Sequence, residues 1–424
     1  MLTRIVRPSP ALETFLQPLL AHLTQPQRQH LLELVDALLV CEDRKTLAAL
    51  QRQYLDSTDP SNWADFLRLS PWSADLMRGA LRRHHLAALL AEAERQGLPK
   101  VLFLNLDDSL GKKDKNTGHL EPVDWFHDHN ESTPNRPRYH KAFCYLECTA
   151  QVGKLTVTLD LRLYLREKTV RRLNRHRAPE QRLTFRSKNR LARAILESVR
   201  SLLPAGWSVY VQFDSWYASE RLLKYVRRQS WHAVCALKSN RKLQGQRLPQ
   251  FATTLQHQRY TPVGLTAADG HTTTYYVREV TGRLSSLPFE VRVFFSKRHP
   301  RARSWAYFLS TEMTRSVVET LRGYGGRWSC EVVNFYTKTQ LGLADFRVRS
   351  YEAVDRYVVA VHLAWAYVEQ RLLRERSAQI RCPGDLIRRH RDEHAQAWLT
   401  AALQEVLATG NVATVLNRFL RQPA

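Results

Sequence analysis

Apolar side chains recur at two different spacings along the chain, and the spacing changes near residue 98. Before that point leucine, valine and phenylalanine return every three or four positions, as in 12–20 and 31–39. This period places apolar groups on one side of a helix. The other helices predicted in this way lie at 44–54, 60–69 and 73–96. We therefore expect residues 1–97 to form an all-helical domain.

From residue 98 onward, short apolar runs and strict alternation predict β-strands. The runs at 101–108 and 207–214 are strongly apolar and each ends in an aspartate, which is typical of strands buried on both faces of a sheet. Val152-Gly153 separates two alternating stretches and suits a tight hairpin turn. The remaining elements predicted up to residue 238 are strands at 141–151, 154–165 and 231–238 and helices at 188–203 and 217–229.

The pattern changes again at 239–313, where threonine, valine and tyrosine alternate. It predicts a small antiparallel β-rich region whose last strand lies at 304–310. Helices resume at 324–338 and 351–375, and short helices finish the chain. The predicted domains are a helical domain at 1–97, the first part of a mixed-sheet domain at 98–238, a β-rich insertion at 239–313, the second part of the mixed-sheet domain at 314–375 and C-terminal helices at 376–424.

The order of the predicted elements indicates a fold class. Three strands followed by helix, strand, helix and strand is the order of a ribonuclease H-like domain. We expect a multidomain α+β and α/β protein in which helices flank a mixed sheet. In this topology the first and fourth strands are neighbours at the sheet centre, and their ends carry Asp108 and Asp214. A later helix that packs on the sheet would bring Glu331 to them.

Glu331 belongs to a stripe of charged residues on the helix predicted at 324–338. At about 100° per residue, Tyr324, Arg327, Glu331 and Lys338 fall within a narrow sector of that helix. The alternative is an ordinary ion pair between Arg327 and Glu331, which are one helical turn apart. Because a Gly-Gly pair follows Tyr324 and lowers helix propensity, Tyr324 can also lie just before the helix.

Three acids that meet at one point repel one another, and divalent cations remove that penalty. Carboxylate oxygens are the ligands that Mg²⁺ prefers, and two ions about 3.5–4 Å apart can drive in-line displacement at a phosphodiester. Asp108, Asp214 and Glu331 are therefore the candidate catalytic and metal-binding residues, with two Mg²⁺ or Mn²⁺ ions per site. Asp107 remains the alternative first ligand, because strand alternation lets only one of the neighbours face the site.

The net charge of +24 comes from 64 Lys and Arg against 40 Asp and Glu, and it is spread along the chain among aromatic residues. This favours a folded protein that binds a polyanion, most simply nucleic acid, with a membrane surface as the weaker alternative. The segment 166–190 is strongly basic. Its Arg171, Arg172, Arg175 and Lys188 are candidate phosphate contacts.

Other features argue against further classes of protein. No stretch approaches 18 apolar residues, so no membrane-spanning helix is expected. The six cysteines form no Cys-x-x-Cys pair, which disfavours zinc and fits a reducing, cytoplasmic setting. His127 and His129 could bind a metal, but their position in a polar, proline-containing loop argues against it.

The motif Tyr324-x2-Arg327-x3-Glu331-x6-Lys338 resembles the Tyr-Arg-Glu-Lys signature of one large group of bacterial insertion-sequence DDE transposases. Asp108-Ser109 is similar to the first-acid motif of that group, which favours Asp108 over Asp107. The other segments that resemble these enzymes are Phe213-Asp214-Ser-Trp-Tyr217-Ala, Leu163-Tyr164-Leu165, Leu341-Gly-Leu343, Phe346-Arg-Val-Arg349-Ser and Glu42-Asp-Arg44-Lys45. Together they cover roughly residues 10–375.

The resemblance implies a role for each matched residue. The metal ligands would be Asp108, Asp214 and Glu331. The contacts to DNA phosphates would come from Tyr324, Arg327, Lys338, Arg347 and Arg349. Trp305, on the last strand of the β-rich region, would receive a flipped base; filling the core of that region is the alternative.

These implications describe a DNA transposase that binds terminal inverted repeats, cleaves by two-metal-ion hydrolysis and joins the 3′-hydroxyl ends to target DNA in a cut-and-paste reaction. A homodimer is expected in the DNA complex, because two ends must be paired. The expected location is the bacterial cytoplasm, at the nucleoid. The alternatives are a ribonuclease H-like nuclease without joining activity and a domesticated, catalytically silent DNA-binding protein, although the presence of all three acids argues against the second.

Overall fold

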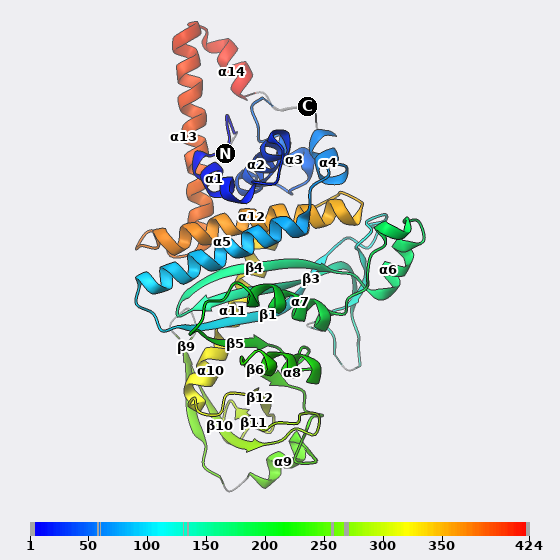
Figure 1. The fold of residues 1–424 in the computed structure, drawn as a ribbon. Helices are drawn as coiled ribbons and strands as arrows, with labels where there is room; N and C mark the ends of the chain where they lie inside the picture. Colours follow the sequence, from blue (N-terminus) through cyan, green and yellow to red (C-terminus); the bar gives the residue numbers. More distant parts are fainter. Residues whose placement is uncertain are drawn as a thin grey trace.

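The computed structural model describes residues 5–56, 59, 61–129, 131–133, 135–255, 258–266 and 271–420. In this part of the chain a mixed sheet of ten strands runs through the molecule, and helices flank it (Figure 1). The outer ends of two predicted domains, residues 1–4 and 421–424, lie outside the described residues. None of the described helices combines the length and the apolarity that crossing a bilayer requires.

The N-terminal part is helical, as predicted. It comprises α1 (Pro10–Leu16), the short 3₁₀ helix η1 (Gln17–Leu19), α2 (Gln25–Val40), α3 (Leu47–Gln51), α4 (Ser61–Arg68) and α5 (Ala74–Arg95). The last of these leaves the others and lies beside α12 (Tyr351–Glu375) across the sheet (Figure 1). Both helices pack on β4 (Leu155–Tyr164), so the N-terminal helices and the sheet share a continuous packing layer.

The strand order is β2-β3-β1-β5-β6-β12-β11-β10-β9, and β4 pairs with β3. The first half of the sheet consists of β1 (Val101–Lys112), β2 (Asp124–His127), β3 (Tyr139–Val152), β4, β5 (Ser208–Phe213) and β6 (His232–Leu237). β1 and β5 pair in parallel and end on the pair Leu106↔Phe213. The predicted neighbours at the sheet centre are therefore confirmed, and Asp107 and Asp214 each follow this last pair.

The β-rich region is antiparallel, as predicted, but it is not a sheet of its own. Its strands are β9 (Thr261–Thr266), β10 (Thr272–Gly282), β11 (Val291–Lys297) and β12 (Ala306–Ser310), preceded by β7 (Lys242–Leu243), β8 (Gln246–Arg247) and α9 (Leu248–Thr254). β12 pairs antiparallel with β6, so β9–β12 extend the central sheet. Alternation predicts each strand but does not say which sheet edge it joins.

Some of the remaining helices pack on the sheet, and the last two of the chain pack on other helices. The remaining helices are α6 (Glu167–Asn174), the 3₁₀ helix η2 (Pro179–Gln181), α7 (Lys188–Arg200), α8 (Glu220–Arg228), α10 (Val317–Gly325), α11 (Trp328–Thr339), α13 (Pro383–Thr409) and α14 (Val412–Leu420). The leucines at 102, 104 and 106 pack with α7 and α8, whereas Asn105 donates to Ser329 on α11. α13 runs past the N-terminal helices, and α14 turns back beside it (Figure 1).

The single helix predicted at 324–338 is wrong, because the chain breaks it at the Gly-Gly pair. α10 ends at Gly325 and α11 begins at Trp328, and between them the N–H groups of Gly326 and Arg327 donate to carbonyl groups three residues back. A Cβ at Gly326 would lie 2.4 Å from Oε1 of Gln151, so a larger residue there would require the Gln151 side chain to move. Tyr324 therefore lies ahead of the helix that carries Glu331, which is the alternative that the glycines indicated.

Buried ion pairs fasten the long helices to the sheet. Arg78 on α5 is 2 % exposed and binds both carboxylate oxygens of Asp355 on α12, at 3.0 and 2.5 Å. One turn further along, Arg82 lies 2.5 Å from Asp160 on β4, which is fully buried. A buried charge that loses its partner costs far more than an exposed one. These pairs therefore fix the register of α5 against β4 and α12.

We predict that Asp160→Ala lowers the free energy of unfolding by about 3–5 kcal/mol, because it leaves Arg82 buried without its partner. The matched control is Asp65→Ala, which removes the exposed Arg68–Asp65 pair, and should cost less than about 1 kcal/mol. Urea unfolding followed by circular dichroism measures both. Equal shifts in the two variants would contradict the structural role assigned to Asp160.

Candidate active site

A cavity of about 810 Å³ opens at the end of β5 and beside the middle of β1, which continues to Lys112 beyond the end predicted at residue 108. Asp107, Asp108, Asp214 and Glu331 all line it. The parallel pairing of β1 and β5 brings the aspartates to one sheet edge, and α11 supplies the glutamate. The carboxylates share the cavity without forming a tight cluster, since the groups of metal-binding side chains within 4.8 Å found among the described residues do not contain them.

The neighbours Asp107 and Asp108 point in different directions, as strand alternation requires. Asp107 forms an ion pair with Arg327, the residue that caps α11. Asp108 accepts a hydrogen bond of 2.6 Å from the Tyr217 hydroxyl and lies 2.5 Å from Nζ of Lys188 on α7. Asp107 thus faces the side of the sheet that α11 covers, and Asp108 faces the side of α7 and α8.

Among the acids that line the cavity, Asp107 has a pKa well above its ordinary value. Burial raises its pKa to about 6, although the Arg327 guanidinium and the N–H of Asp108 favour the ionised form. The negative charges of Asp214 and Asp108 add to the increase. Asp107 therefore titrates near neutral pH, and any further positive charge in the cavity would favour its ionised form.

A further acid, Glu147, lies beneath the cavity and was not predicted from the sequence. It is opposite Asp107 in the β1–β3 pair and is fully buried. Burial, together with the charge of Asp107, raises the pKa of Glu147 well above its usual range. Asn334 on α11 donates to Glu147 at 2.9 Å and accepts from the Tyr145 hydroxyl at 2.5 Å. The only signal in the sequence was an acid within an otherwise apolar strand.

Cations surround the acids. Nζ of Lys338 donates to the Ser109 hydroxyl at 2.6 Å, and Lys188 and Arg327 hold the two aspartates. Burial lowers the pKa of Lys338, while for Lys188 the effect of burial is outweighed by Cys144 and Asp108, which raise its pKa. The cavity therefore presents both signs of charge close together, which suits a metal and a phosphate arriving together.

Two further residues at the cavity were not predicted. Trp216 follows Asp214 by two positions and is 45 % exposed. Nζ of Lys238 lies 4.6 Å above its ring, and Nζ of Lys188 lies at 5.7 Å. An exposed ring between two ammonium groups offers a stacking surface beside phosphate-binding charge. Its place in the Asp214-Ser-Trp-Tyr217 motif was the signal that could have identified it.

The other predicted DNA contacts lie at different depths. The hydroxyl of Tyr324 donates to the carbonyl of Phe213 at 3.2 Å, so the ring packs beneath the end of β5. Trp305 does not line the cavity; it is half-buried, packs on Phe295 and has Nζ of Lys297 4.1 Å above its ring. The exposed residues among them are Arg171, Arg172 and Arg175 on and just after α6 and Arg347 and Arg349 before α12.

His127 and His129 lie at the rim of the same cavity, 3.4 Å apart between Nδ1 and Nε2. Beside them Asp128, Glu131 and His140 bring their ligand atoms within 4.8 Å of one another. Nζ of Lys112 already lies 2.7 Å from Asp128 and 2.5 Å from Glu131. The Lys112 ammonium thus offsets one of the two carboxylate charges in this group.

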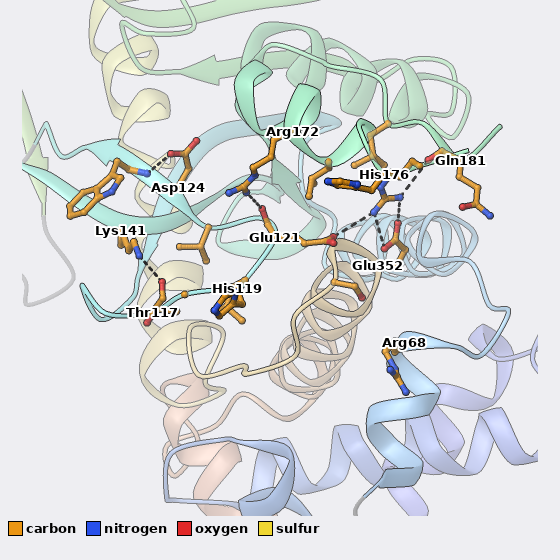
Figure 2. A pocket seen from close by; sticks show the side chains of 18 residues that line it. Arg68, Thr117, His119, Glu121, Asp124, Lys141, Arg172, His176, Gln181 and Glu352 are labelled. Atoms are coloured by element: carbon orange, nitrogen blue, oxygen red, sulfur yellow. Dashed lines mark hydrogen bonds and ion pairs between the residues drawn. The ribbon is translucent and has the colours of Figure 1, made fainter. Parts of the chain in front are cut away.

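A larger cavity of about 1010 Å³ lies away from these acids (Figure 2). Figure 2 shows Arg172 on α6 and Arg68 on α4 at different sides of it. Two of the acids that line it already interact with an arginine: Arg177 pairs with Glu352 at 2.5 Å and lies 3.5 Å from Glu121. Since no free carboxylates converge there among the described lining residues, its size does not make it the better candidate for chemistry.

Comparison of the sequence with models of known protein families gives information that is independent of the cavity. The family model described as DDE superfamily endonuclease matches residues 18–283. The matched stretch includes Asp107, Asp108 and Asp214 and ends before Glu331. A search of curated proteins found no match.

We predict that Asp107 makes a contribution to stability that is lost as the pH rises from about 4 to about 6, because it binds its proton more tightly in the folded chain than in the unfolded chain. The slope from this one group would approach 1.4 kcal/mol per pH unit. The variant Asp107→Asn should lack that component, and Ser109→Ala should keep it. Thermal unfolding across this pH range measures the difference; parallel curves for all three proteins would contradict the buried, proton-binding state of Asp107.

Proposed function

Because the chain belongs to the family of DDE superfamily endonucleases, we propose that it is a DNA transposase. It would bind terminal inverted repeats, cleave the DNA strand by metal-dependent hydrolysis and join the 3′-hydroxyl ends to target DNA. The observation that carries this proposal is the cavity at the end of β5 and beside β1, where Asp214 and Glu331 share the lining with Arg327 and Lys338. Acids from distant parts of the chain meet cations and an exposed tryptophan there.

Endonucleases of this superfamily typically use divalent metal ions, and the residues present fit such ions. Asp214 uses one carboxylate oxygen to accept from the N–H groups of Trp216 and Tyr217, at 2.9 and 3.3 Å. Glu331 is exposed and accepts no hydrogen bond from the described residues. We propose that these two acids and one neighbouring aspartate hold two Mg²⁺ or Mn²⁺ ions. When bound, the ions supply an activated water or 3′-hydroxyl and stabilise the leaving oxygen.

For the first ligand, the direction of the side chains favours Asp107 over Asp108. Asp107 lies on the face of the sheet that α11 covers, and its pKa responds to the charge of Asp214. Asp108 is engaged on the opposite face, where it contacts Tyr217 and Lys188. Asp108 would then position Lys188 at the cavity instead of binding metal. The resemblance of Asp108-Ser109 to a first-acid motif favours Asp108 instead, and substituting each aspartate alone separates the two assignments.

The cations would bind the DNA strand. Arg327 and Lys338 would contact the phosphate being cut, and Lys188 and Lys238 would contact its neighbours. Trp216 would stack a base or sugar between these ammonium groups, an interaction of roughly 1–3 kcal/mol. Farther from the cut, the exposed arginines of α6 and of the segment before α12 would neutralise phosphates of the duplex, which makes binding sensitive to salt.

A homodimer would pair the two ends, and the C-terminal helices offer a surface for it. Leu399, Leu403 and Leu407 follow one another at four-residue spacing on α13 and are 54, 56 and 86 % exposed. The stripe lies on the C-terminal half of α13 (Figure 1). A continuous exposed apolar stripe marks an interaction surface, and we propose a second copy of this chain as its occupant. Light scattering of the complex with end DNA tests this; the mass of one chain per complex would exclude it.

We predict that Asp214→Asn lowers Mg²⁺-dependent cleavage of end DNA by at least about 1000-fold, since it removes a ligand that supplies several kcal/mol of transition-state stabilisation. Binding of the same DNA should change little. Supplying pre-cut ends then separates joining from cutting: the wild type should insert them into a target. Cleavage without insertion would identify a nuclease, and retained cleavage in the variant would refute the assignment of the site.

We predict a different effect for each of the neighbouring aspartates. Asp107→Asn should match the loss in Asp214→Asn, whereas Asp108→Asn should lower cleavage by less than about 100-fold, the range for residues that position others. The exposed Asp114 provides the control, because Asp114→Asn removes an equal charge nearby. The reverse order of effects would return the first ligand to Asp108.

A further inference from the structure

A second group of potential metal ligands lies far from the carboxylate cavity, where α13 packs against α2. Asp36 on α2 and His390 and His394 on α13 bring their ligand atoms within 4.8 Å of one another. Their side chains are almost fully buried, with exposed fractions of 0, 1 and 4 %. The two segments are 354 residues apart in the sequence. We propose that these three residues form a binding site for a divalent transition-metal ion, zinc being the best fit.

The geometry converges on one point. Nε2 of His390 and Nε2 of His394 lie 2.7 and 3.0 Å from the same oxygen, Oδ1 of Asp36. The two histidines are one turn apart on the face of α13 that is buried against the body, where apolar residues would otherwise be expected. The second oxygen of Asp36 accepts from the N–H of Ser9 at 2.9 Å, which fixes the orientation of the carboxylate.

The hydrogen bonds alone leave this arrangement incomplete. If each neutral imidazole donates through Nε2–H to Oδ1, then Nδ1 of His390 is an acceptor. That atom is buried and finds no hydrogen-bond partner among the described residues. A cation bound at Nε2 moves the ring proton to Nδ1, and Oε2 of Glu393 lies 4.0 Å from Nδ1. Metal-bound histidines commonly direct their second N–H at such a carboxylate.

The donor set selects the kind of ion. Two imidazole nitrogens and one carboxylate oxygen are ligands that zinc accepts, with a water molecule in the fourth position. Mg²⁺ prefers oxygen ligands, so the ion proposed for the carboxylate cavity would not compete well here. A bound ion would link the N-terminal half of α13 to α2. It is independent of the proposed cleavage chemistry.

The test uses the full-length protein, stripped with a chelator and then given zinc in the presence of excess Mg²⁺. We expect about one zinc per chain to remain after desalting, and thermal unfolding to shift upward by on the order of 5 °C relative to the stripped protein. Replacement by Co²⁺ should give the absorption bands of a four-coordinate ion. No retained zinc and no shift in the wild type would overturn the proposal, and this result needs no variant to fold.

Variants then locate the ion. His390→Asn and His394→Asn should each lose the retained zinc and the thermal shift, with circular dichroism confirming that they remain folded. The control His22→Asn removes an exposed histidine from the same helical part of the chain and should keep both. Equal zinc retention in all three variants would place the ion elsewhere and reject this site.

Discussion

Repulsion among carboxylates is the constraint on which the arrangement around the candidate active site depends. Asp107, Asp108, Asp214 and Glu331 line one cavity, and Glu147 lies buried beneath it. The chain reduces the repulsion in three ways. Arg327 and Lys188 pair with the two neighbouring aspartates, burial favours the neutral form of Glu147, and Glu331 remains exposed to solvent. What stays uncompensated is the charge that a divalent ion would neutralise.

The scaffold is rigid where this charge is concentrated. The parallel ladder between β1 and β5 sets the positions of Asp107 and Asp214, and α11, which begins just after the Gly-Gly pair, carries Glu331 to the same cavity. Behind the sheet, the pairs Arg78–Asp355 and Arg82–Asp160 hold α5 and α12 in register. Buried ion pairs add little net stability when complete, but they penalise any other register. The positions of the acids thus depend on the backbone pairing of β1 with β5 and on ion pairs that lie away from the cavity.

Much of this could be predicted from the sequence, because apolar runs that end in aspartates and helical periodicity are local signals. The helices of the N-terminal part and α12 followed from them, and the β1–β5 pairing followed from the order of strands and helices, which is that of a ribonuclease H-like domain. The orientation of Asp107 relative to Asp108 did not follow, since it depends on where β1 enters the sheet, and neither did the pairing of β12 with β6. Trp216 lies in a motif visible in the sequence, whereas Lys238 and Glu147 acquire meaning only from neighbours brought close by folding. The same holds for Asp36 and His390, which no local pattern connects.

The tandem aspartates within β1 have a consequence for strand register. Consecutive residues of a strand face opposite sides, so a one-residue slip of β1 against β5 would turn each side chain to the other face. A slip in one direction would bring Asp108 beside Arg327 and Ser109 beside Lys188, whereas a slip in the other direction would bring Leu106 beside Arg327. The tandem acids therefore keep a carboxylate on the α11 side of the sheet after a slip in one direction, which a single aspartate would not do in either.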